Sequence, residues 1–156
     1  MRNKILRSRA FWGLHFDFHA SAESEGIGRE LCEEHLLRML DGVQPDFIQC
    51  DCKGHEGYAS YLTAFENRAP GMEEDILKTW VSAAQKRNTT ICVHYSGVVD
   101  RRAVCVHPAY ARQNEDGGYD SESTSVFGGY CESLMIPQLK EIAAYGVDGV
   151  WVDGEC

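Results

Sequence analysis

Four short apolar runs, separated by stretches with helical periodicity, are the feature that most constrains the fold of this chain. The runs cover residues 11–19, 46–52, 89–96 and 149–153, and they are rich in β-branched or aromatic side chains. Each run has the length of a buried strand. Strands that alternate with helices favour parallel pairing and right-handed crossovers. The sequence therefore predicts an α/β fold with about four parallel strands, each paired with the next along the chain.

The stretches between the runs carry apolar residues three or four positions apart, which is typical of helices with one buried side. The apolar positions are Ile27, Leu31, Leu36, Leu37 and Leu40, then Ile76, Leu77, Trp80, Val81 and Ala84, then Leu139, Ile142 and Ala143. Asp41-Gly42, Asn88 and Tyr145-Gly146 are the expected helix ends. The three helices complete the predicted βαβαβαβ order.

Residues 100–129 are the least regular stretch and are rich in Gly, Ser, Asn and Asp. A connection of this length exceeds what a crossover needs. It is typical of an active-site loop or lid, and equally of a mobile surface loop. Both interpretations stay open at this point.

Length and charge limit the classes of protein to consider. The 156 residues match the size of one domain, so we predict a single domain over residues 1–156. A formal charge of −9 argues against nucleic acid and against an anionic membrane surface as partners. The chain contains no apolar run near the roughly 20 residues that span a bilayer. We predict no cofactor and no metal.

Cysteine content bears on the compartment. The seven cysteines are odd in number and irregularly spaced, unlike a disulfide framework. The basic start of the chain is not followed by the long apolar segment of a secretion signal. We therefore expect free thiols and a cytoplasmic protein.

Every predicted strand ends in polar residues that are capable of chemistry. Parallel α/β folds carry their active sites at the carboxyl ends of strands. In the first run, a period of two puts His15, Asp17 and His19 on one face. The candidate site residues at the four strand ends are His15, Asp17, His19, Lys53, His55, Glu56, Tyr58, His94, Tyr95, Trp151, Asp153 and Glu155.

A packing role is the alternative for each of these residues. A lone strand histidine is more commonly a hydrogen-bonded core residue, and Asp153-Gly154 is also a common turn or helix-cap sequence. Four polar ends in succession favour a functional site, because each buried charge costs free energy unless it is paired. We expect the side chains of His15, Asp17, His55, His94 and Asp153 to converge in one pocket.

Three segments resemble the α-L-fucosidase family. Residues 138–154 contain QLKEI, YGVD and VWVDG, similar to the family's QLxEL, YGPD and LWFDG around its nucleophile. Residues 53–58 (KGHEGY) resemble the KHHDGF stretch that contacts the sugar, and residues 94–96 (HYS) resemble YYS. The matches fall in order over residues 11–154. The chain is also similar to small groups of bacterial proteins called hypothetical glycosyl hydrolases, which share the Cys-Lys-Gly-His segment.

The resemblance implies the N-terminal half of a (β/α)₈-barrel glycoside hydrolase. It implies retaining hydrolysis with a carbohydrate substrate, Asp153 as the nucleophile, and sugar contacts from the other candidate residues. Gly54 stands where the family has the first histidine of its pair, and Asp17 stands where it has another histidine. These differences leave the sugar open.

The second carboxylic acid of a retaining glycosidase lies roughly 5–5.5 Å from the nucleophile. In the fucosidases it comes from a later part of the barrel, and Glu155 is only two residues from Asp153. Four strands do not close an eight-stranded barrel. We therefore expect a fragment of a longer enzyme, a gene truncation, or a half-barrel that pairs with a copy of itself as a homo-oligomer.

Two other functions remain. A metal-dependent hydrolase of the amidohydrolase type could use His15, Asp17, His19, His55 and His94 as ligands, although the usual His-x-His of the first strand is absent. Cys50, Cys52, Cys105 and His107 lack the usual zinc-ligand spacing and are better explained as buried thiols. A non-catalytic carbohydrate-binding half-barrel is the other alternative.

Overall fold

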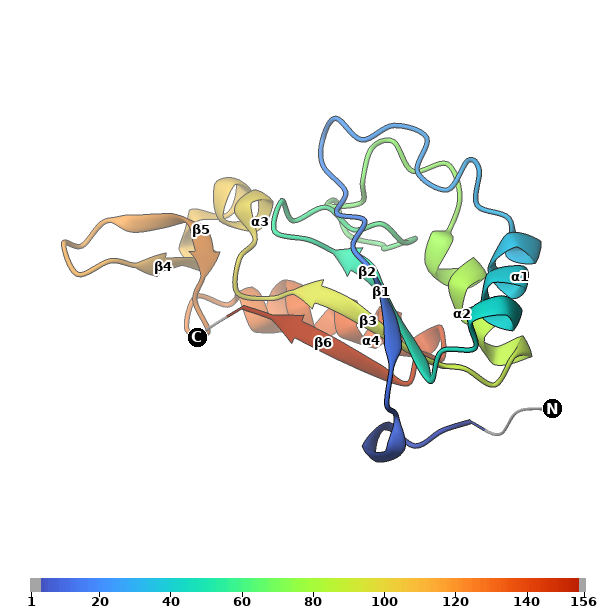
Figure 1. Cartoon of the computed structure of the whole chain (residues 1–156). Helices are drawn as coiled ribbons and strands as arrows, with labels where there is room; N and C mark the ends of the chain where they lie inside the picture. Colours follow the sequence, from blue (N-terminus) through green and yellow to red (C-terminus); the bar gives the residue numbers. More distant parts are fainter. Residues whose placement is uncertain (1–3, 155–156) are drawn as a thin grey trace.

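The computed structural model describes residues 4–154, and a four-stranded parallel sheet forms its centre (Figure 1). The strands are β1 (Gly13–Phe16), β2 (Phe47–Lys53), β3 (Thr90–Ser96) and β6 (Gly149–Asp153), in the order β1-β2-β3-β6. All three neighbouring pairs are parallel. The predicted α/β fold, with strands paired in chain order, is confirmed.

Three α-helices pack against the sheet: α1 (Glu33–Val43), α2 (Ile76–Lys86) and α4 (Ile136–Ala144). Their apolar sides share one core cluster with alternate strand residues, among them Ile48, Cys50, Ile91 and Val93. Since strand side chains alternate between faces, the residues between these belong to the opposite face. The helix-covered face is therefore the apolar core, and the opposite face is left for polar side chains.

The first predicted helix begins later than its apolar spacing indicates. Ile27 forms an isolated parallel bridge with Met72, residues 28–30 form a turn, and α1 starts at Glu33. Gly28 has φ +89°, a conformation outside the helical region, and the Ile27 N–H donates to the Gly71 carbonyl at 2.9 Å. Ile27 thus packs against the core from non-helical backbone, which preserves the apolar pattern without the helix.

The first strand is also shorter than its apolar run. The backbone N–H groups of Phe11 and Trp12 donate to the Asp46 carboxylate, at 2.7 and 3.2 Å. The N–H groups of these two residues therefore bond to a side chain, while the Trp12 carbonyl accepts from the backbone N–H of Asp46 at 3.0 Å, just before β2. Phe11 is exposed, so its aromatic ring does not mark a buried strand position.

The long segment after β3 contains regular structure. It holds α3 (Arg101–Val106), a 3₁₀ turn (Pro108–Tyr110), and an antiparallel hairpin of β4 (Ala111–Gln113) and β5 (Tyr119–Thr124). Figure 1 shows this hairpin beyond the carboxyl ends of β3 and β6. A π-helical turn, η3 (Cys131–Met135), leads into α4, and a short 3₁₀ turn, η1 (Arg7–Arg9), precedes β1.

The structure also bears on the cysteines and on membrane helices. The cysteines between residues 4 and 154 are free thiols. Burial raises the pKa of Cys50 to about 12 and raises the pKa of Cys52 well above its ordinary value. Over the same residues, no helix combines the length and the apolar character that crossing a bilayer requires.

Candidate active site

The strand register brings Asp51, His94 and Asp153 together on the polar face of the sheet. Asp51 is in register with His94, and Ser96 with Asp153. The Nδ1 atom of His94 lies 2.6 Å from Asp51 Oδ1, and its Nε2 atom lies 3.3 Å from Asp153 Oδ2. One imidazole thus bridges two carboxylates from the strands on either side of it.

Proton positions on His94 follow from these contacts. Nδ1 faces the carboxylate of Asp51 and therefore carries a hydrogen, so Nε2 carries one only when the ring is cationic. Burial works to lower the pKa of His94, but the hydrogen bond and charge of Asp51, together with those of Asp153, outweigh it and raise the pKa. The cationic form, which donates to Asp153, is thereby favoured.

His55, just after β2, approaches Asp153 from a second direction. Its Nε2 lies 3.6 Å from Asp153 Oδ2, and its Nδ1 lies 2.8 Å from Ser96 Oγ. The Ser96 hydroxyl donates to the Val99 carbonyl at 2.6 Å, so it accepts from His55 Nδ1. Asp153 therefore has two imidazoles beside it.

The Asp153 carboxylate is held in its ionised form while 36% of the side chain remains exposed. Desolvation works to raise its pKa, but the hydrogen bond and charge of His94, with a smaller contribution from His55, lower it. A half-buried, ionised carboxylate on a rigid strand end can act as a nucleophile toward a bound molecule.

The segment after β1 adds a third histidine and a third carboxylate. His19 Nε2 lies 2.7 Å from Asp17 Oδ1 and 3.5 Å from Asp51 Oδ1, and its ring stacks on His94 with centroids 5.2 Å apart. The ring of His15 meets His94 edge-on at 6.5 Å. The five residues expected to converge are thus linked through His94 and His19. Their roles in binding stay a prediction.

Gly54 explains how His19 fits into this arrangement. A Cβ atom at Gly54 would lie 2.5 Å from Cγ of His19, closer than real Cβ contacts come. The histidine that the fucosidase pattern has at this position would need the space that the His19 ring fills. Glycine at position 54 therefore leaves the room in which the His19 ring lies.

Lys53 and Tyr95 point away from this cluster. Lys53 is fully buried, paired with the Asp100 carboxylate, and donates to Tyr130 Oη at 2.8 Å. Burial lowers the pKa of Lys53, against the opposing effect of Asp100. Tyr95 is also fully buried and donates from Oη to Gln138 Oε1 at 2.8 Å. Lys53 thus links β2 to Asp100 at the start of α3, and Tyr95 links β3 to α4.

The other predicted residues have mixed positions. Glu56 pairs with Arg101, and Tyr58 Oη accepts a 3.2 Å hydrogen bond from Arg102, so both contact α3. Trp151 is 57% exposed, and its place in β6 puts it on the same face as Asp153. The prediction for Glu155 lies outside the described residues.

Asp51 was absent from the predicted site, although its side chain is fully buried and central to the cluster. A signal for it exists in the sequence. It is an acidic residue near the end of a largely apolar run, and such a residue needs a partner when it is buried. The partner could not be chosen without the strand register. His19, Asp51 and His94 also each offer a metal-ligand atom, all within 4.8 Å of one another.

Comparison with known proteins identifies the family of this chain. The family model for α-L-fucosidase matches residues 46–156. No curated protein matches the sequence significantly.

Solved structures share the fold at low identity. α-L-Fucosidase isoenzyme 2 from Paenibacillus thiaminolyticus superposes with a TM-score of 0.81 at 23% identity, over 94% of this chain and 24% of that one. A putative α-L-fucosidase from Bacteroides ovatus gives 0.63 at 23%, over 93% and 25%. The α-L-fucosidase AlfC from Lactobacillus casei, in complex with α-L-fucose product, gives 0.62 at 15%, over 92% and 58%.

This chain thus spans about a quarter of the length of the Paenibacillus enzyme. The family model, which covers more than half of the sequence and includes β2, β3 and β6, decides the assignment. The chain belongs to the α-L-fucosidase family.

Proposed function

We propose that this chain supplies the nucleophile side of a retaining glycoside hydrolase site, with Asp153 as the nucleophile and an α-L-fucoside or a related sugar as substrate. The observation that carries the proposal is the setting of Asp153, a solvent-accessible, half-buried carboxylate at a strand end beside His94 Nε2 and His55 Nε2. The lowered pKa of Asp153 keeps it ionised.

In this mechanism a carboxylate oxygen of Asp153 attacks the anomeric carbon, and the bond from that carbon to the leaving-group oxygen breaks. A carboxylic acid on the other side of the sugar protonates the leaving oxygen. Water then attacks the glycosyl ester, the former acid accepts a proton from that water, and the Asp153 carboxylate is released. Cationic His94 stabilises the departing carboxylate in this second step.

The opposing acid must come from outside the four strands described here. A closed barrel of this type has eight strands, and the chain covers 22% to 60% of the length of the fucosidase structures it resembles. We infer that the remaining strands of a longer chain, or a second copy of this one, complete the site. Exposed Trp151 offers an apolar ring for a sugar face.

The test is hydrolysis of 4-nitrophenyl α-L-fucopyranoside by the complete enzyme, either the longer chain or the assembled oligomer. This substrate needs little help from the acid because its leaving group is activated. We expect Asp153→Asn to lower kcat by roughly 10³-fold or more, as loss of a nucleophile does.

Asp41→Asn is the matched control, because it makes the same change at an exposed carboxylate paired with Arg87. Its rate should equal that of the wild type. Equal rates for wild type and Asp153→Asn would show that Asp153 is a turn residue. Sugar binding without turnover in every form would select the carbohydrate-binding alternative.

A further inference from the structure

The cluster around Asp51 has a property that glycoside hydrolysis does not require. The Asp51 side chain is fully buried, and its Oδ2 atom has no hydrogen-bond partner among residues 4–154. A buried carboxylate oxygen without a donor is costly. Its other oxygen, Oδ1, is approached by nitrogens of His19 and His94, at 3.5 and 2.6 Å.

We propose that His19, Asp51 and His94 form a binding site for a divalent transition-metal ion, with Zn²⁺ the best match. Two imidazole nitrogens and one carboxylate oxygen are a common ligand set for zinc, which leaves a fourth position open. The three ligand atoms lie within 4.8 Å of one another, so small side-chain movements bring them to bonding distance from one ion. A cation bound at this position would balance the buried negative charge of the Asp51 carboxylate.

The ligands come from three separate segments that the fold holds in place. Asp51 and His94 lie on the paired strands β2 and β3, and His19 follows β1. The His19 ring is confined between the His94 ring and the backbone at Gly54. Because His19 is 34% exposed and His94 only 7%, the ion would enter from the His19 side.

Two further carboxylates have defined places around the proposed ion. With Nδ1 of His94 on the metal, its Nε2–H donates to Asp153, and such a carboxylate–histidine–metal arrangement orients the ligand. Asp17 now contacts His19 Nε2 at 2.7 Å, and it is placed to become the fourth ligand when that nitrogen binds the metal. Metal-bound His94 is neutral, so zinc should oppose hydrolysis, a consequence that rests on the proposed function.

The experiment is calorimetric titration of the untagged 156-residue chain with zinc chloride, without sugar, at neutral pH and with thiols kept reduced by a phosphine. We expect one equivalent to bind, and at least ten-fold weaker binding by His19→Ala. The matched control is His107→Ala, since His107 is another exposed histidine beside a carboxylate, that of Glu66 at 3.5 Å. This control should bind zinc as the wild type does.

Cobalt substitution distinguishes this site from the cysteines. Bound Co²⁺ should show visible bands without a thiolate charge-transfer band. Asp51→Asn, shown to be folded by circular dichroism, should also lose binding. No binding by the wild type, unchanged binding by His19→Ala, or a strong thiolate band would overturn the proposal. None of these readouts uses glycosidase activity, so this proposal and the proposed function can fail separately.

Discussion

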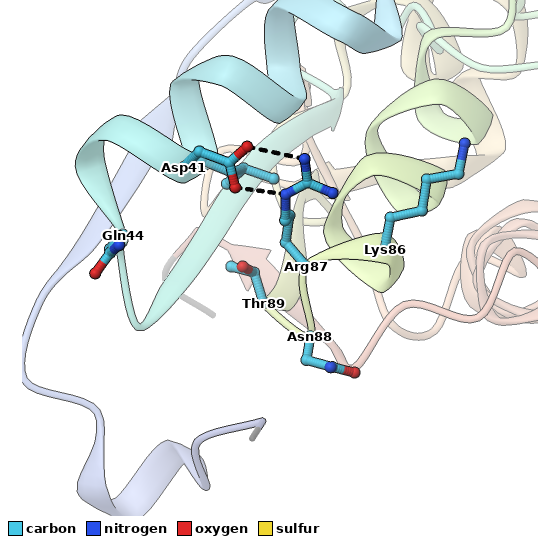
Figure 2. A pocket seen from close by; sticks show the side chains of 7 residues that line it. Asp41, Gln44, Lys86, Arg87, Asn88 and Thr89 are labelled. Atoms are coloured by element: carbon cyan, nitrogen blue, oxygen red, sulfur yellow. Dashed lines mark hydrogen bonds and ion pairs between the residues drawn. The ribbon is translucent and has the colours of Figure 1, made fainter. Parts of the chain in front are cut away.

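The two edges of the parallel sheet are both rich in polar residues, yet they use them differently. At the amino edge, where α1 and α2 end, Arg87 donates to both oxygens of Asp41, at 2.5 and 2.8 Å (Figure 2). Gln44 and Asn88 have φ of 52° and 51° and end these helices in left-handed turns. At the carboxyl edge, Asp51, His94 and Asp153 form a chain of shared contacts.

The difference lies in burial and in the number of partners. Arg87 and Asp41 are exposed and bind mainly each other, as surface ion pairs do. His94 is buried between two carboxylates, which raise its pKa, and in return it lowers that of Asp153. Polar composition therefore does not by itself indicate a functional site, whereas buried titratable groups that shift one another's pKa are typical of one.

The largest expected effect tests burial at the carboxyl edge. Lys53→Met removes the cation of a fully buried pair and leaves Asp100 buried without it. We expect a loss of about 3–5 kcal/mol in the free energy of unfolding, measured by urea unfolding. Lys53→Met combined with Asp100→Asn should recover part of that loss, because no buried charge remains uncompensated. A loss under about 1 kcal/mol, the range of surface pairs, would contradict the comparison.

The next effect concerns the fit between Gly54 and His19. Gly54→Ala places a Cβ against the His19 ring. Overpacking of this kind costs about 1–3 kcal/mol, and the NMR signals of the His19 ring should shift. Gly42→Ala is the control at the amino side, where a Cβ would meet nothing within 4 Å. An unshifted His19 in Gly54→Ala would show that the ring is not confined there.

A third effect concerns the charge on His94. Its folded-state pKa is raised, so it contributes stability that is fully present below its unfolded pKa and is lost as pH rises through the folded value. Asp51→Asn and Asp153→Asn should each lower the pKa of His94, and Asp51→Asn should lower it more. NMR titration of the imidazole carbon-bound protons measures this. An unchanged pKa of His94 in Asp51→Asn would show that the Asp51 carboxylate does not interact with His94.

The sequence predicted the features that depend on local pattern. Apolar runs identified the four strands, and their alternation with helices identified the parallel order. The turn at Gly28 was not predicted, because Ile27 and Leu31 have a helical spacing and both pack against the core although their backbone is not helical. The hairpin of β4 and β5 was missed because few of its residues are buried, so it lacks the apolar alternation that predicts a strand.

Features that depend on register were beyond reach of the sequence. Lys53 follows two residues after Asp51, which by simple alternation would put both on one face. A register shift between them separates their surroundings, so Lys53 reaches Asp100 and Tyr130, whereas Asp51 reaches His94. No residue type in this segment predicts such a register shift. The role of Gly54 could not be predicted either, because it depends on the His19 ring, which lies against it only in the folded chain.

The smallest effect is expected at the amino edge. Arg87→Met makes the counterpart of the Lys53→Met change, removing the cation from a pair that has two good hydrogen bonds. Because both side chains of this pair are exposed, water replaces the lost contacts to Asp41, and little net free energy is at stake. The urea midpoint should stay within the error of the measurement, and raising the salt concentration should change wild type and variant alike. A shift comparable to that of Lys53→Met would mean that pairing geometry and not burial decides stability at the two edges.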